Sequence, residues 1–279
     1  MSMSVEGLLY RPLALLPAHA TALLERLRII GADRPVAPSA FLDGVEETAS
    51  RDRRRPYEVV DGIAIVRIQG VLVHGDDCCW WWGETSYASI RRTLLAALAD
   101  PEVKAVVLHV DSPGGEVAGC FDLADDIYRL RGEKPIVAIV DEYCCSAAYA
   151  LASAADRIVA PRTAVIGSIG VITMHLDVTA ALEQAGLKVT TVQFGDRKSD
   201  SYPTTVLSDD ARKRMQADID SLGKMFVALV ARNRDLNPDA VRATEAGTFL
   251  GAAAVKAGLS DAVLTPDAAF AALVETLGD

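Results

Sequence analysis

A serine among small residues is the first side chain in this sequence whose setting suggests chemistry. Ser146 lies in the run YCCSAAY, between an apolar strand expected at Ile136–Val140 and a helix expected from about Cys144 to Ala154. A hydroxyl at such a junction lies near the positive end of the helix dipole, and the next amide, that of Ala147, can donate to an oxyanion. Serine is also a common helix N-cap, so this run alone leaves a purely structural role open.

Two adjacent glycines form a second segment of chemical interest. Gly114 and Gly115 end the run DSPGG, which follows an apolar strand expected at Ala105–Val110 and precedes a helix. We expect a tight turn there, with amide N–H groups pointing into a cleft. Fixed N–H donors aimed at a carbonyl oxygen stabilise its developing charge by about 2.7–4 kcal/mol each. A strand-to-helix turn without any ligand explains the run equally well.

A lysine in a polar loop completes the set of candidate residues. Lys198 lies in FGDRKSDSYP, after a strand expected at Lys188–Gln193. A lysine acts as a general base only in its neutral form, which burial beside a nucleophile favours. Most loop lysines are solvated, so the position alone does not assign catalysis. Lys188 and Lys224 compete in principle, but they are expected at a strand start and on a long helix.

The other nucleophiles and bases fit less well. His109 is expected inside a strand, where a packing role is favoured, so a Ser-His-Asp triad is not indicated. Cys144 and Cys145 could supply a thiolate, but small buried side chains are the better interpretation. The five cysteines are odd in number and lack C-x-x-C spacing, which favours neither disulfides nor a metal site and indicates a reducing compartment.

Bulk composition limits the classes of function. The 279 residues are 51% hydrophobic, enough for a sizeable core, and the formal net charge of -10 argues against nucleic-acid binding. No apolar run reaches the roughly 18 residues of a membrane span, so we expect a cytoplasmic protein. The short basic run Arg51–Arg55 is interpreted as a solvated linker.

The order of expected elements predicts two regions. Residues 1–55 form a leader or adaptor with an amphipathic helix at Ala18–Ile29, and residues 56–279 form the main domain. Asp61-Gly62 is a hairpin turn signal. Helices and strands then alternate up to a long helix at about Asp209–Arg234. This alternation predicts an α/β fold with a parallel sheet covered by helices.

Taken together, four motifs resemble the signal peptide peptidase A family of serine peptidases. They are DSPGGEVAG, YCCSAAYALASAAD, IGSIGV and GDRKSD, in matching order and spacing over roughly Val60–Leu264. The resemblance implies that Ser146 is the nucleophile and Lys198 the general base. It also implies oxyanion donors at Gly114 or Gly115 together with Ala147, and no metal or cofactor. Ser168 in IGSIGV matches a hydroxyl position that orients the lysine, although a plain turn residue explains it equally.

The resemblance also carries expectations about fold and partners. It implies a fold like that of crotonases and the caseinolytic protease, built from stacked ββα units. Family members form homo-oligomeric rings in which serine and lysine can come from neighbouring subunits, and their substrates are proteins or peptides. The CCWWWG segment, His109 and the Cys144-Cys145 pair depart from the usual pattern. These departures bear on substrate preference more than on mechanism.

Two branches of the family differ in context, and two rival functions share its fold. The segment SYASIRRTLLAALADPEVKAVVLHVDSPGGEVAGCFDLAD and the RPLALLP run resemble phage proteases that trim scaffold or portal proteins during capsid maturation. The alternative branch degrades signal peptides in bacteria. The rivals are a crotonase-like acyl-CoA enzyme and a non-enzymatic capsid-assembly or scaffold-binding protein. The presence of both Ser146 and Lys198 argues against each rival.

Overall fold

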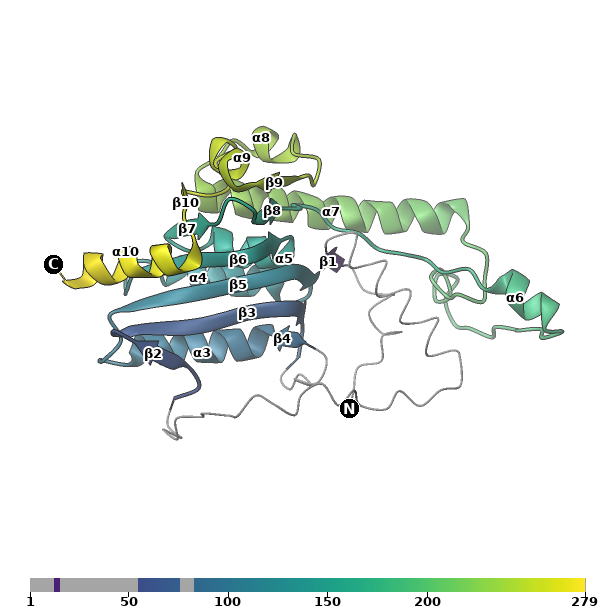
Figure 1. The fold of residues 1–279 in the computed structure, drawn as a ribbon. Coiled ribbons are helices and arrows are strands. Elements are labelled where there is room, and N and C mark those ends of the chain that lie inside the picture. Colours follow the sequence, from purple (N-terminus) through teal and green to yellow (C-terminus); the bar gives the residue numbers. More distant parts are fainter. Residues whose placement is uncertain (1–12, 16–54, 76–82, 279) are drawn as a thin grey trace.

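The computed structural model describes residues 13–15, 55–75 and 83–278 (Figure 1). The helix expected at Ala18–Ile29 and the tryptophans Trp80–Trp82 lie outside the described residues. The strands are β1 (Leu13–Leu15), β2 (Glu58–Val60), β3 (Ile63–Val73), β4 (Glu84–Ser86), β5 (Ala105–Glu116), β6 (Ile136–Cys145), β7 (Arg157–Ala160), β8 (Val165–Gly167), β9 (Thr248–Leu250) and β10 (Ala262–Val263). The helices are α3 (Tyr87–Ala99), α4 (Cys120–Arg129), α5 (Ala147–Ser153), α6 (Thr179–Gln184), α7 (Asp209–Arg234), α8 (Pro238–Arg242), α9 (Gly251–Lys256) and α10 (Pro266–Gly278).

A mostly parallel sheet forms the centre of the described structure. Its main path runs β10-β7-β6-β5-β3-β2, and along that path only the β2–β3 pair is antiparallel. The antiparallel pair is closed by Asp61 and Gly62, whose φ angles of 51° and 79° are typical of a type I′ hairpin turn. The expected α/β class and the expected hairpin are therefore confirmed.

Alternation along the strands divides the core between two faces of the sheet. In β5, Val106, Leu108 and Val110 belong to one apolar cluster, whereas Ala105 and Val107 belong to the other. The first cluster includes side chains of α3, α4, α5 and α7, and the second includes side chains of α10. Because successive side chains of a strand point to opposite faces, helices cover the sheet on both sides (Figure 1).

The long strands have register shifts partway along their length and gain further neighbours beyond them. The β3–β5 register shifts between Gln69 and Val71, and the β5–β6 register shifts between Val110 and Ser112. Gly70 allows the first shift because its φ is +64° and a Cβ there would lie 1.8 Å from the Gly83 carbonyl oxygen. Beyond the shifts, β3 pairs with β4, and β6 pairs with β8.

This continuation corrects one expectation from the sequence. The DSPGG run is not a tight turn, because residues 111–115 are part of strand β5, which continues up to Glu116. A glycine pair ordinarily indicates a turn, but here β3 lies alongside both glycines and pairs with them. The two glycines therefore lie within strand β5 and not in a turn.

Residues 171–207, which we call the arm, leave the body of the protein between β8 and α7. The arm carries α6, which Figure 1 shows well away from the sheet. Its two limbs are joined where the Val178 N–H donates to the Pro203 carbonyl at 2.9 Å. The strand expected at Lys188–Gln193 is wrong, because this exposed stretch has no strand partner in the described structure.

The long helix after the arm agrees with the sequence. α7 begins at Asp209, where the Ser208 side chain caps it by accepting from the Ala211 N–H, and ends at Arg234. Its first half extends beside the arm, and its last turns pack into the core (Figure 1). None of the helices in the described part of the chain is both long enough and apolar enough to cross a membrane.

Candidate active site

Ser146 occupies a strained backbone position between β6 and α5. Its φ and ψ angles are 54° and -118°, a region that residues with a side chain rarely adopt. Its N–H donates to the Gly167 carbonyl at 2.7 Å, and its carbonyl accepts from the Ala150 N–H at 2.9 Å. Such strain persists only where the surroundings impose it, and it is common at catalytic residues. A sharp strand-to-helix turn of this kind presents the nucleophile in α/β-hydrolases.

The Ser146 side chain is held in place by small neighbours. Its Oγ donates to the Gly170 carbonyl at 3.4 Å, and the residue is 1% exposed. Ala147, Ala148 and Ala150 of α5 are completely buried, which lets the helix pack closely on its neighbours. The run of alanines that follows the serine is therefore a requirement of packing.

The glycines of β5 lie beside this serine. Ser112 of β5 pairs with Cys144 of β6, and two residues further along these parallel strands lie Gly114 and Ser146. Gly114 has a φ of 108°, and a Cβ on Gly115 would lie 1.9 Å from the Leu72 carbonyl oxygen. Both positions therefore require glycine.

The amide N–H groups near Ser146 differ in whether they have a hydrogen-bond acceptor within their own strand or helix. The Gly114 N–H donates to Ser112 Oγ at 3.2 Å. Ala147 is the first residue of α5, and the first N–H groups of a helix have no partner within it. The Ala147 N–H therefore has no acceptor within α5, which suits the expected role of an oxyanion donor. The oxyanion role of Gly114, Gly115 and Ala147 stays a prediction.

Glu116 is the last residue of β5 and directly follows the two glycines. Its hydrogen bonds hold this end of the strand, which we call the strand edge Gly114–Glu116, in place. It is completely buried, its carboxylate accepts from the His74 N–H at 2.8 Å, and its carbonyl accepts from the Tyr87 hydroxyl at 2.6 Å. Buried polar groups held in this way keep their positions. The edge from Gly114 to Glu116 is therefore rigid.

Ser168 lies on a second strained segment next to Ser146. It follows Gly167, the acceptor of the Ser146 N–H, and has a φ of 53°. The Ser168 N–H donates to the Gly247 carbonyl at 3.0 Å. The residue before Gly247, Ala246, also has a positive φ, of 55°. The structure thus brings Ser168 to the site, and its role toward a lysine stays a prediction.

Lys198 is not brought to Ser146 within one chain. It lies on the exposed arm, in a turn where its N–H donates to the Gly195 carbonyl at 3.1 Å. Among the residues that the structure describes, no hydrogen bond or ion pair joins Lys198 to Ser146. The strand edge, Ser146, Ala147 and Ser168 therefore form one cluster, and the expected base lies outside it.

The buried thiols next to Ser146 are poor nucleophiles. Cys144 and Cys145 are completely buried, and burial raises the pKa of Cys145 to about 12 and that of Cys144 well above its usual value. Burial likewise raises the pKa of Cys120 to about 12. Since the thiolate is the reactive form, these three cysteines remain neutral and unreactive at pH 7.

We expect iodoacetamide at pH 8 to leave Cys120, Cys144 and Cys145 unmodified in the folded protein. Their raised pKa values and their burial both suppress the thiolate. Peptide mass spectrometry measures labelling at each cysteine, with the urea-unfolded protein as the control in which all three react. Rapid labelling of Cys145 in the folded protein would contradict this expectation and make Cys145 a candidate nucleophile.

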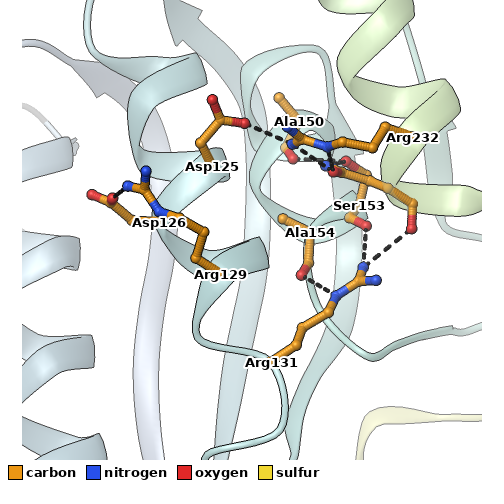
Figure 2. A network of polar contacts seen from close by, with 9 residues as sticks. Asp125, Asp126, Arg129, Arg131, Ala150, Ser153, Ala154 and Arg232 are labelled. Atoms are coloured by element: carbon orange, nitrogen blue, oxygen red, sulfur yellow. Dashed lines mark hydrogen bonds and ion pairs between the residues drawn. The ribbon is translucent and has the colours of Figure 1, made fainter.

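An arginine that sequence reasoning missed holds the other end of α5. Arg131 donates to the carbonyl groups of Ser153 and Ala154 at 3.0 and 2.8 Å (Figure 2). It also donates to the Ala155 carbonyl at 2.6 Å and to the Asn233 carbonyl of α7 at 3.2 Å. One guanidinium therefore satisfies the last carbonyls of the helix that begins beside Ser146, and it connects that helix to α7.

We expect Arg131→Met to lower the free energy of unfolding by about 2 kcal/mol or more, because it leaves several carbonyls without a charged donor. Arg129→Met is the matched control, since Arg129 is 71% exposed and its side chain pairs only with Asp126 among the described residues. Its expected loss is under about 0.5 kcal/mol. Urea unfolding at one fixed protein concentration measures both, and equal losses would contradict the role of Arg131.

Comparisons with known proteins identify the family of this chain. The model of "Peptidase family S49" matches residues 129–278, a span that includes Ser146 and Lys198. The head-tail preconnector protein GP5 of Enterobacteria phage P21 is 40% identical over 243 residues, covering 86% of this chain and 48% of that protein. The capsid assembly protease C of Escherichia phage lambda is 38% identical over 224 residues, covering 80% of this chain and 51% of that protein.

The chain therefore spans about half the length of these two curated relatives. Among solved structures, an enoyl-CoA hydratase/isomerase family protein from Silicibacter pomeroyi is similar with a TM-score of 0.46 and 15% sequence identity, over 79% of this chain and 80% of that one. The family match extends over more than half of the chain and includes the strained serine with the helix that follows it. The chain belongs to peptidase family S49.

Proposed function

We propose that this protein is a serine endopeptidase in which Ser146 is the nucleophile and Lys198 the general base. The observation that carries the proposal is the strained Ser146, at φ 54° and ψ -118°, beside the glycine edge of β5 in a member of family S49. Strain at a buried hydroxyl beside a helix N-terminus is difficult to explain by packing alone. A purely structural N-cap would have extended angles and a side-chain bond to the helix, and Ser146 has neither.

The proposed reaction proceeds through an acyl-enzyme. Ser146 Oγ leaves its bond to the Gly170 carbonyl and attacks the peptide carbonyl carbon, while the neutral amine of Lys198 takes the hydroxyl proton. The Ala147 amide and a glycine amide of β5 stabilise the oxyanion. When the C–N bond breaks, the lysine returns the proton to the leaving amine. Water then hydrolyses the ester, again with the lysine as base.

The position of Lys198 favours a site shared between subunits. The arm that carries it exposes large apolar side chains, with Val192 95% exposed and Phe194 fully exposed. Apolar side chains exposed in this way are typical of surfaces that contact another protein. We propose a homo-oligomer in which the arm of one subunit covers the neighbouring subunit and brings Lys198 to its Ser146. A ring follows if each subunit contacts the next in the same way.

The proposed substrates are capsid-assembly proteins of a phage or prophage. This proposal is supported by the similarity to the P21 head-tail preconnector protein and the lambda capsid assembly protease, both phage proteins. We propose portal and scaffold proteins as the substrates, cleaved in the host cytoplasm or within the procapsid. Bacterial signal-peptide degradation is the alternative within the same family.

Co-expression tests the substrate class. We expect intact-mass spectrometry to show defined fragments of the scaffold or portal protein from the same phage when the wild-type chain is present. With Ser146→Ala those fragments should be absent. If the wild-type chain cleaves generic peptides but leaves both capsid proteins intact, the substrate proposal is wrong. If it binds them and cleaves nothing, the non-enzymatic alternative is correct.

A further inference from the structure

A segment of the chain itself pairs with the strand edge beside Ser146. β1 pairs antiparallel with β5, with Leu15 opposite Gly114, Ala14 opposite Gly115 and Leu13 opposite Glu116. Figure 1 places β1 at that end of β5. About 90 residues of sequence separate the two partners, so the pairing is not part of a local hairpin.

The edge that β1 occupies is the one that faces the serine. At Gly114 and Gly115, β3 pairs with one edge of β5 through Val71 and Leu72. The opposite edge pairs with β6 only as far as Ser112 and Cys144, because the chain of β6 then turns into α5 at Ser146. A strand has two edges, so β1 takes the place that β6 leaves free.

The direction of β1 matches that of a peptide about to be cleaved. β1 runs from the Glu116 end of β5 toward the Gly114 end, and Gly114 is the paired residue nearest in register to Ser146. An extended peptide bound in this direction carries its following carbonyl toward the nucleophile. Strand addition of this kind binds through the main chain, so it accepts many sequences.

We propose that the strand edge Gly114–Glu116 is the peptide-binding edge of the site and that Leu13–Leu15 occupies it as an intramolecular competitor of substrate. This inference rests on the proposed function, since it assigns the edge to the same Ser146 site. A second observation agrees with it: Gly114, Gly115, Glu116 and Ser146 are all buried in the intact chain, as expected of an edge that is already occupied. Substrate must displace β1 before it can bind.

The test measures binding separately from cleavage. The probe is a fluorescent peptide with the sequence of residues 10–18, YRPLALLPA, titrated into the full chain carrying Ser146→Ala. The test variant adds Ala14→Pro and Leu15→Pro. Alternate residues of a strand direct their N–H groups to opposite edges, so two adjacent prolines remove a ladder donor whichever residue faces β5. Ser39→Pro with Ala40→Pro is the matched control, outside the paired segment.

We expect the Ala14→Pro/Leu15→Pro chain to bind the probe about tenfold more tightly, the change expected if β1 occupies the edge in about nine molecules of ten. The control prolines should leave affinity unchanged. Of the adjacent Gly115 and Glu116, one directs its N–H toward β1, and hydrogen exchange at that residue should increase in the test variant and decrease again with saturating probe. In the chain with Ser146 intact, the same prolines should lower KM for a reporter peptide and leave kcat unchanged.

Equal affinities in all three chains, or no binding of the probe to any of them, would overturn the inference. Because these chains carry Ser146→Ala, the binding result does not depend on catalysis. Failure of the proposed function would instead appear as absent cleavage by the wild-type chain. The two failures are therefore distinguishable.

Discussion

Replacing Ser146 with alanine is expected to lower kcat/KM for peptide cleavage by about 10⁴-fold or more, as is usual when a covalent nucleophile is removed. Alanine lacks the Oγ that attacks the substrate, and the strained backbone at φ 54° still holds a Cβ. A fluorogenic peptide assay or intact-mass detection of fragments measures the loss. Ser221→Ala is the matched control, because Ser221 is exposed on α7 and bonds only to the Ala217 carbonyl among described residues.

A glycine at the same position separates catalysis from stability. Relief of a strained φ is worth about 1–3 kcal/mol, and glycine costs about 0.5–1 kcal/mol in chain entropy. Ser146→Gly should therefore be inactive yet more stable than Ser146→Ala by about 1 kcal/mol, measured by urea unfolding of oligomers at equal concentration. If Ser146→Ala retains activity near that of Ser221→Ala, Ser146 is not the nucleophile.

Lys198→Arg is expected to lower kcat/KM by about 10³-fold or more, because a guanidinium keeps the positive charge but does not lose its proton. A lysine that only contacted a partner through its charge would tolerate this change. Lys188→Arg is the control, since Lys188 is exposed on the same arm and should tolerate it. Size-exclusion chromatography must show the same oligomer for both variants. Full activity of Lys198→Arg would exclude Lys198 as the base.

The sequence predicted well those elements whose signals are local. The hairpin at Asp61-Gly62 needs only two residues that accept positive φ, and α7 needs its cap at Ser208 and helical residues up to Arg234. Ser146 was also identified as a candidate from its neighbours alone. Its backbone strain was not predicted, because the bond to Gly167 that imposes it comes from 21 residues further along the chain.

The expectations that failed depended on distant partners. Gly114 and Gly115 indicated a turn, but residues of β3 some 40 positions earlier extend the strand. The run from Lys188 to Gln193, rich in β-branched residues, indicated a strand, but it has no partner in the described structure. A high content of β-branched residues shows that a segment suits a sheet and does not show where its neighbour is. The sequence did not indicate the role of Arg131, because its acceptors are backbone carbonyls, which every residue has.

The measurement that tests the central claim most directly is subunit complementation. Ser146→Ala and Lys198→Ala chains, each inactive alone, are unfolded, mixed in equal amounts and refolded together. If Ser146 of one subunit works with Lys198 of the next, about a quarter of the sites receive both intact residues, and activity returns to about a quarter of the wild-type level. Native mass spectrometry confirms that mixed oligomers form. If mixed oligomers form and remain inactive, the shared Ser146–Lys198 site is wrong.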